Sequence, residues 1–396
     1  MHASTILRRC LSSVLEPMHG TRCRVLLMAV EALIAGRRLT LTDLARSWPG
    51  AVWMHAPLKA LDRLLSNRHV LGAVMPLHRA MLPWLIRQPQ PWVIVDWSDL
   101  KRDGRWCLLR AAVPVRGRTL TLYEKIYPAG QLNSPRAQRE FLRELQGLLP
   151  TGLTPILVTD AGFRSDWFRA VAAQGWYYLG RVRNNTQVNR SNTASWQPCA
   201  ALHPGASRKP KELGAYRIVK GDPWPCRLVL ARHPRSHRDT LTRRGTPLQG
   251  TSARKARKSA REPWLLATSL PAQSHRATQL VAVYAQRMQI EEAFRDLKSH
   301  RYGMGLEDSL TRSAERLTVL LLLQTLALFA AWIMARAVAA SGQQQDPLAR
   351  QPRHRSRYSW MQRGIAWLHR RWPPDLHPWI SRQALASYLD ADAFNT

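Results

Sequence analysis

Acidic residues are scarce in this chain. Its 396 residues include 26 Asp and Glu against 59 Lys and Arg, a formal net charge of +33. Because so many positively charged side chains repel one another, we expect a polyanionic partner that neutralises them: nucleic acid first, an anionic membrane surface second. With 45% hydrophobic residues the chain is still too apolar to be disordered throughout. The charge argues against an ordinary metabolic enzyme.

Cysteines are few as well. Five of them are widely scattered without a C-x-x-C pair: Cys10, Cys23, Cys107, Cys199 and Cys226. This pattern argues against a disulfide framework or a structural zinc site and fits a reducing cytosol. We therefore expect a cytoplasmic protein that associates with the nucleoid.

Long apolar runs are also rare. Residues 317–334 are apolar and just long enough to cross a bilayer as a helix. They carry Gln324 and Thr325 in mid-span, however, and no other segment resembles them. The pattern therefore favours a buried core helix over membrane contact, and we expect no membrane partner.

The first 85 residues show helical spacing. We expect helices near 24–35, at 39–45 behind a Thr cap, and at 58–65, where Lys59 and Arg63 lie. Short helices around a basic turn are typical of a helix-turn-helix-like DNA-binding unit. A plain helical bundle with a solvated basic face explains the pattern as well.

The hydrophobic period changes from residue 91 onward. The patterns predict a mixed α/β fold, with antiparallel strands first and alternating helices and strands after them. Short strands then precede a basic stretch. The expected strands are 92–95, 105–115, 118–127, 154–159, 176–182, 215–219, 227–231 and 264–270, and the expected helices are 135–149, 165–174 and 278–298.

Two aspartates share one context. Asp96 and Asp160 each directly follow a buried strand. Ligands of α/β sheets gather at the carboxyl ends of strands, so the two side chains could converge, and divalent Mg²⁺ prefers such oxygen ligands. A turn or helix cap is the structural alternative for each aspartate alone.

A third acid lies on the expected helix 278–298. At about 100° per residue, a polar stripe borders the apolar arc of this helix. The stripe holds Tyr284, Arg287, Glu291, Arg295 and Lys298. One acid among cations suits a metal ligand beside phosphate-binding groups. An exposed face of i,i+4 ion pairs fits equally well.

These residues resemble a known signature. Tyr284-x₂-Arg287-x₃-Glu291-x₆-Lys298 is similar to the Y-R-E-K signature of DDE transposases of the insertion-sequence-four family. The surroundings agree over nearly the whole chain. They are VDWSDL at 95–100, TLYEK at 121–125, VTDAGF at 158–163, EPWLLAT at 262–268 and RMQIEEAFRDLKS at 287–299. They look most like the branch that contains the cut-and-paste transposase of a tetracycline-resistance transposon.

The resemblance implies an RNase H-like catalytic core. That core would span 89–310, with a β-rich basic insertion at about 184–270. A helical DNA-binding domain, 1–88, would precede it. A helical C-terminal region, 311–396, would supply a core-packing helix and then DNA or dimer contacts. The resemblance also selects Asp96 over Asp99 and Glu291 over Glu292.

The implied chemistry is metal-dependent phosphoryl transfer at DNA ends. Two Mg²⁺ ions, with Mn²⁺ as a substitute, would lie about 3.5–4 Å apart and serve an in-line displacement. Their ligands would be Asp96, Asp160 and Glu291. The implied steps are nicking, hairpin formation and resolution, and strand transfer from transposon ends to target DNA by a dimer in a synaptic complex. The sequence shows no Walker A motif and no G-x-S-x-G elbow.

The resemblance also implies DNA contacts. Tyr284, Arg287 and Lys298 would bind phosphates near the transposon end, joined by Arg295 on the same stripe. Trp264 would stack on a flipped base, although a core position in a strand is its structural alternative. We expect the basic stretch to order on DNA, against the alternative of a solvated loop. Its candidate contacts are Arg243, Arg244, Arg254, Lys255, Arg257 and Lys258.

A second function from another class stays open. The chain could be a catalytically inactive, transposase-derived DNA-binding protein or regulator that uses only its N-terminal helices. The presence of all three acids favours the active enzyme.

Overall fold

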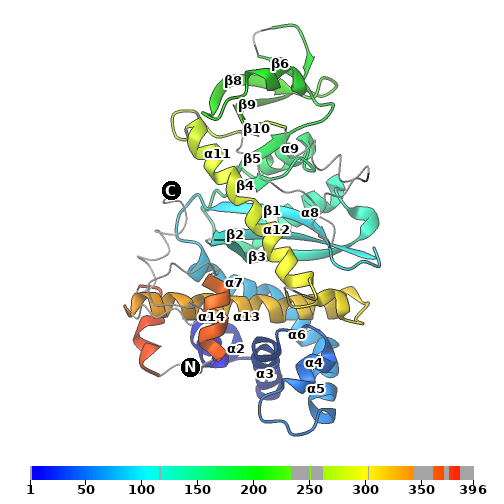
Figure 1. Ribbon diagram of the computed structural model, residues 1–396, viewed down its shortest axis with the longest axis vertical. Helices are drawn as coiled ribbons and strands as arrows, with labels where there is room; N and C mark the ends of the chain where they lie inside the picture. Colours follow the sequence, from blue (N-terminus) through cyan, green and yellow to red (C-terminus); the bar gives the residue numbers. More distant parts are fainter. Residues whose placement is uncertain are drawn as a thin grey trace. The chain divides into compact units, whose positions relative to one another are not determined.

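The computed structural model divides the chain into two compact units. It describes residues 2–115, 117–191, 193–232, 250, 262–301, 303–342, 360–369 and 374–383. The first unit consists of Met1–Pro155 and Gln286–Thr396, and the second of Ile156–Ala285 (Figure 1). The domain boundaries expected from the sequence stay predictions.

The N-terminal part of the first unit is helical, as the sequence predicts. Thr40 caps α4 by accepting a hydrogen bond from the backbone N–H of Asp43 at 3.1 Å. Asn67 caps α6 in the same way. The helices are α1 Ala3–Cys10, α2 Ser12–Leu15, α3 Gly20–Gly36, α4 Leu41–Arg46, α5 His55–Leu65, α6 Arg68–Gly72 and α7 Val74–Leu85.

The sheet of the first unit is antiparallel, in the order β3-β2-β1. The strands are β1 Trp92–Asp99, β2 Trp106–Val115 and β3 Arg118–Pro128. The register of β2 and β3 is that of an antiparallel hairpin, which confirms the antiparallel strands expected at 105–115 and 118–127. The strand expected to end before Asp96 is longer: β1 continues to Asp99, so the prediction that Asp96 lies at a strand end was wrong. The turn η1 Ala129–Gln131 and helix α8 Pro135–Leu148 follow.

The apolar segment forms a single long helix, α13 Ala314–Ala340. It contacts α1, α3, α5, α14 Trp360–His369 and strand β3. The described chain has one helix apolar and long enough to span a membrane, and 94% of the most apolar window of α13 is buried inside the protein. A helix that is hydrophobic on all sides is buried either in a protein core or in a membrane. Burial therefore favours the core interpretation.

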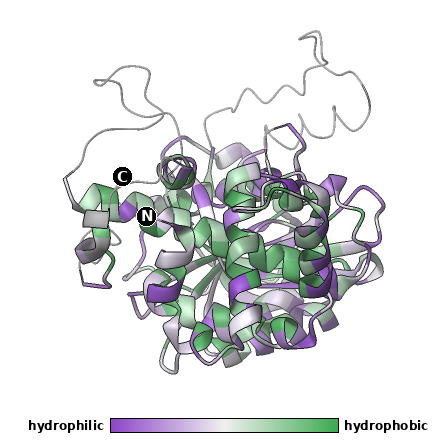
Figure 2. Cartoon of the chain, turned by 90° about the horizontal axis from the view of Figure 1, so that it is seen from below, coloured by the Kyte–Doolittle hydropathy of each residue, from purple (hydrophilic) through white to green (hydrophobic). Residues whose placement is uncertain are grey.

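The helix α14 lies very close to α13. A side-chain carbon at Gly364 would collide with the carbonyl oxygen of Ala331, so only glycine fits this crossing. Figure 2 shows that the helices carry both hydrophobic and hydrophilic residues and that several of the connecting loops are hydrophilic. The remaining elements of this unit are α12 Met288–Lys298, η3 Leu306–Asp308 and η4 Pro374–Trp379.

The two polar residues in the middle of α13 have buried partners. The guanidinium of Arg110 donates to the side-chain oxygen of Gln324 at 3.2 Å, and the Thr325 hydroxyl donates to Glu124 at 3.2 Å. Arg110 and Glu124 themselves form an ion pair of 2.6 Å. Gln324 and Thr325 therefore satisfy a buried ion pair between β2 and β3, which explains why this apolar helix carries them.

The sheet of the second unit runs in the order β4-β5-β10-β9-β8-β6-β7. Strands β4 and β5 pair in parallel, and the pairs β5-β10, β10-β9, β9-β8, β8-β6 and β6-β7 are antiparallel. The elements are β4 Ile156–Thr159, α9 Ser165–Ala173, β5 Tyr177–Val182, β6 Gln187–Arg190, β7 Gln197–Pro198, η2 Cys199–Gly205, β8 Lys211–Ile218, β9 Trp224–Ala231, β10 Trp264–Thr268 and α11 Ala277–Gln286, whose last residue belongs to the first unit.

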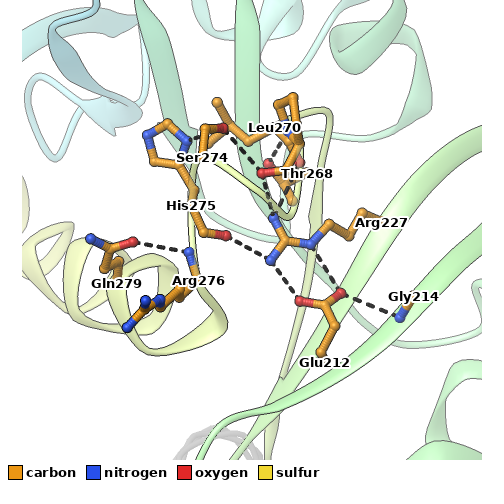
Figure 3. A network of polar contacts seen from close by, with 10 residues as sticks. Glu212, Gly214, Arg227, Thr268, Leu270, Ser274, His275, Arg276 and Gln279 are labelled. Carbon is orange, nitrogen blue, oxygen red and sulfur yellow. Dashed lines mark hydrogen bonds and ion pairs between the residues drawn. The ribbon is translucent and has the colours of Figure 1, made fainter.

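One arginine organises the approach to α11. Arg227 of β9 pairs with Glu212 of β8 at 2.6 Å (Figure 3). The same guanidinium donates to the carbonyl oxygens of Leu270, at 3.2 Å, and His275, at 2.7 Å. The turn between β10 and α11 is therefore fixed to the sheet.

The predicted mixed α/β class is confirmed, while one helix differs. The expected continuous helix 278–298 is two helices, α11 and α12, separated at Arg287. Neither glycine nor proline lies at this interruption, so no helix-breaking residue in the sequence marks it.

The buried histidine of α7 makes the stability of this fold depend on pH. His78 of α7 is 1% exposed, and burial lowers the pKa of its imidazole. The positive charge of Arg110 lowers that pKa further, against the opposing charge of Glu124. His78 is therefore neutral in the folded chain at pH values where an unfolded chain would already bind a proton.

We expect the free energy of unfolding to fall as the pH drops below about 6.5, the pKa of histidine in an unfolded chain. For this one proton the loss is at most about 1.4 kcal/mol per pH unit. The substitution His78→Leu should flatten the dependence, measured by urea unfolding between about pH 5 and 8. A variant that keeps the full wild-type dependence would contradict this role of His78.

Candidate nuclease site

The site begins with an acid in the middle of a buried strand. Asp96 is 8% exposed, and hydrophobic residues of β1 precede it: Val93, Ile94 and Val95. Its Oδ1 accepts a hydrogen bond from the backbone N–H of Trp97 at 2.9 Å. The strand therefore presents a carboxylate at a buried position.

Arg287 joins Asp96 to the second acid of the site. Its Nη1 lies 3.0 Å from Oδ2 of Asp96, and its Nη2 lies 2.6 Å from Oε1 of Glu291. Arg287 caps α12, and Glu291 lies one turn further along that helix. The guanidinium side chain is only 11% exposed. One cation thus holds two carboxylates that are 195 positions apart in the sequence.

The other predicted cations of α12 divide into two groups. The Lys298 ammonium donates to the Ser98 hydroxyl at 3.0 Å, two residues after Asp96 on the same face of β1. Arg295 instead pairs with Glu292 on its own helix, and its side chain is 55% exposed. Lys298 therefore contacts the strand that carries Asp96, while Arg295, which also lines the cavity described below, is more exposed.

A cavity of about 580 Å³ opens beside these residues. Asp96 and Glu291 line it together with hydroxyl, aromatic and cationic side chains. The other lining residues are Trp97, Ser98, Arg102, Phe294, Arg295, Lys298, Ser299, His300, Arg301 and Glu307. A cavity that holds carboxylates and an excess of cations suits a metal-bound phosphodiester.

Four of these lining residues were not among the site residues predicted from the sequence: Ser98, Arg102, His300 and Arg301. Ser98 had a detectable signal, since a residue two positions after a functional acid in a strand shares its face. Arg102 and Arg301 had none, because each lies in a loop that only the tertiary fold places at the cavity. Arg102 pairs with Glu307 at 3.2 Å.

Asp96 and Glu291 are chemically suited to a divalent cation. Carboxylate oxygens are the ligands that Mg²⁺ prefers, and both carboxylates already share one positive charge, that of Arg287. Among the described residues there is no group of three or more His, Cys, Asp or Glu side chains arranged around one ion position. The pair therefore fits a cation, and the complete ligand set is a prediction.

Asp160 belongs to the second unit. It directly follows β4, as predicted, and its Oδ1 accepts a hydrogen bond from the backbone N–H of Gly162 at 2.8 Å. This is the turn geometry that the structural alternative anticipated. One oxygen of the carboxylate thus orders the turn, and a role in metal binding stays a prediction.

The predicted aromatic contacts also lie in the second unit. Tyr284 of α11 is 3% exposed and packs edge-on against Trp264 of β10, with 4.9 Å between ring centroids. Trp264 itself is half-buried. The packing contact gives Trp264 a structural role in this form of the chain, and DNA contacts by either ring stay predictions.

The basic stretch expected to bind DNA, 232–261, lies outside the described residues except for Arg232 and Gly250. This applies to every candidate contact in it, namely Arg243, Arg244, Arg254, Lys255, Arg257 and Lys258. The adjoining Glu262 is described, and it accepts from Arg183 at 2.7 Å.

Comparison with known families decides the identity. A family model described as "Transposase DDE domain" matches residues 87–330, more than half of the chain. The chain belongs to this family of DDE transposases. No significant match occurs among curated proteins. The DDE domain of the match contains β1, α12 and hence both carboxylates that share Arg287.

The shared cation generates a prediction for this transposase domain. In Arg287→Gln the guanidinium no longer competes for the two carboxylates, so Mn²⁺ should bind the DNA-free protein more tightly, by roughly threefold or more. DNA binding should weaken, with a salt slope reduced by about 0.9 for each lost phosphate contact. Loss of the free-ion paramagnetic resonance signal measures Mn²⁺ binding, and gel shifts measure DNA binding.

The matched control is Arg295→Gln. It removes the same charge from the same helix, but Arg295 pairs with Glu292 and not with Asp96 or Glu291. Equal Mn²⁺ affinities for the two variants would show that the bridge by Arg287 does not restrain the carboxylates.

Proposed function

We propose that this DDE transposase is a cut-and-paste enzyme of the insertion-sequence-four type. It would bind the terminal inverted repeats of its element, nick them, form and resolve hairpins, and transfer the ends to target DNA. The observation that carries the proposal is the convergence of Asp96 and Glu291 on Arg287, inside the matched domain and beside a cationic cavity.

The chain's own residues support phosphodiester chemistry. Asp96, Glu291 and Asp160 would hold two Mg²⁺ ions, which when bound would activate the attacking oxygen and stabilise the leaving one. Lys298, held by Ser98, presents a positive charge at the same cavity. Once the carboxylates bind metal, Arg287 would exchange its carboxylate partners for a DNA phosphate, as its place in the Y-R-E-K signature suggests.

The net charge of the chain supports the proposed assembly with DNA. A net charge of +33 suits a protein that holds transposon ends and target DNA at once, as a dimer in a synaptic complex. The RNase H-like core, the helical DNA-binding domain and the nucleoid-associated cytoplasmic location belong to the same proposal. The five free, buried cysteines are compatible with that location.

A DNA-binding protein without catalysis is the second candidate. The observation in its favour is that the guanidinium of Arg287 already satisfies both carboxylates in the first unit. Such a regulator would bind the element's ends through the N-terminal helices and leave them intact. Strand cleavage separates the two functions.

We expect Asp96→Ala, Asp160→Ala and Glu291→Ala each to abolish strand cleavage and to leave end binding largely intact, because each removes a metal ligand. The assay incubates the purified chain with Mg²⁺ and DNA that contains the inverted repeats flanking its coding sequence. Denaturing gels report nicked, hairpin and flush-cut ends, and gel shifts report binding.

Two neighbouring carboxylates provide matched controls. Asp99→Ala changes an exposed acid of the same strand, and Glu292→Ala changes the acid next to Glu291. Both controls should cut DNA. If any of the three site variants cuts at a rate near that of the wild type, that residue does not belong to the site. A wild-type protein that binds its ends and never cuts them would favour the regulator.

A further inference from the structure

A row of charged side chains crosses the sheet of the first unit. Asp96 of β1 lies opposite Arg110 of β2, and Arg110 lies opposite Glu124 of β3. Directly opposite residues of antiparallel strands project from the same face. All three are buried, Arg110 most completely at 1% exposed. The acid of the candidate site is thus the end of a buried row of alternating charge.

Arg110 contacts three elements besides its own strand. Its Nη2 lies 2.6 Å from Oε2 of Glu124 on β3 and 3.2 Å from the side-chain oxygen of Gln324 on the core helix α13. Its guanidinium carbon lies 5.1 Å from the centroid of the Phe294 ring on α12. That distance is within the range of a cation–π contact.

Phe294 links this network to the site. It lies three residues after Glu291, close to one turn of α12, and it lines the same cavity as Asp96 and Glu291. The helix that carries Glu291 therefore rests, through Phe294, on a guanidinium fixed by β3 and α13.

The local backbone is adapted to this residue. The register of β2 and β3 shifts between Ala111 and Ala112, directly after Arg110. Such bulges redirect side chains and are enriched beside active sites. A buried ion pair is also weak evidence for stability, since apolar residues can replace one at little cost. Its place next to the site points to a role in geometry.

We propose that Arg110 is a positioning residue for the nuclease site. It fixes the seat of α12 on the sheet, and with it the position of Glu291 relative to Asp96, through Phe294. Arg110 itself contacts neither DNA nor metal. The inference rests on the proposed function and adds a determinant of metal affinity outside the Y-R-E-K signature.

The test compares variants for Mn²⁺ affinity, DNA-end affinity, cleavage and thermal melting. Arg110→Lys keeps the charge but loses the planar guanidinium that contacts Glu124, Gln324 and Phe294 together. We expect Mn²⁺ binding about tenfold weaker, in the range found for residues that orient metal ligands, and cleavage that needs correspondingly more Mg²⁺. End binding should stay within about twofold of the wild type.

A second variant keeps the test informative if Arg110→Lys does not fold. Phe294→Leu leaves the Arg110–Glu124 pair in place and removes only the aromatic contact, so it should weaken Mn²⁺ binding in the same direction. Arg227→Lys is the control, because Arg227 is another networked arginine, paired with Glu212 in the second unit. It should lower the melting temperature and leave Mn²⁺ affinity unchanged.

The outcomes separate this inference from the proposed function. If the wild type cuts DNA and both Arg110→Lys and Phe294→Leu bind Mn²⁺ like the wild type, Arg110 has no positioning role. The positioning role is also overturned if the variants melt at a lower temperature and bind both DNA ends and Mn²⁺ correspondingly more weakly. Such a general loss is what substitution of a merely structural residue would cause. A wild type that binds Mn²⁺ at this site without cutting DNA refutes the proposed function alone.

Discussion

The contact on which the site depends is the guanidinium of Arg287 between two carboxylates. Asp96 comes from the middle of a strand and Glu291 from a helix nearly 200 positions later, yet both contact one guanidinium. Two carboxylates that lie this close in space repel each other unless a cation lies between them. In a chain with a net charge of +33, that cation is one of its own arginines. One positive charge thus lies between the two carboxylates before any ligand binds, and in the proposed mechanism a metal or a phosphate would exchange with Arg287.

The same principle extends beneath the site. Arg110 balances Glu124, and Gln324 and Thr325 of the apolar helix α13 satisfy the pair. The core of the first unit thus holds a polar network where a helix of such length could have been wholly apolar. Because the network touches β2, β3, α12 and α13, the packing of the core and the geometry of the carboxylates are parts of one structure.

Local pattern was enough to predict much of the fold. The Thr40 cap, the hairpin of β2 and β3 and the buried helix α13 all follow from hydrophobic period and cap residues. The interruption at Arg287 could not be predicted, because no helix-breaking residue marks it. The pairing of Ser98 with Lys298 and that of Arg110 with Gln324 could not be predicted for another reason: the partners lie 200 and 214 positions apart, and only tertiary packing brings them together.

We propose that Asp96, Asp160 and Glu291 hold one metal site, and iron-directed cleavage of the chain can test this arrangement. Fe²⁺ replaces Mg²⁺ in the purified protein, ascorbate and peroxide then generate hydroxyl radicals at the bound ion, and mass spectrometry maps the cut peptide bonds. We expect cuts close to residues 96, 160 and 291, all suppressed by excess Mg²⁺. Cuts confined to other parts of the chain, or no cuts that Mg²⁺ suppresses, would contradict it.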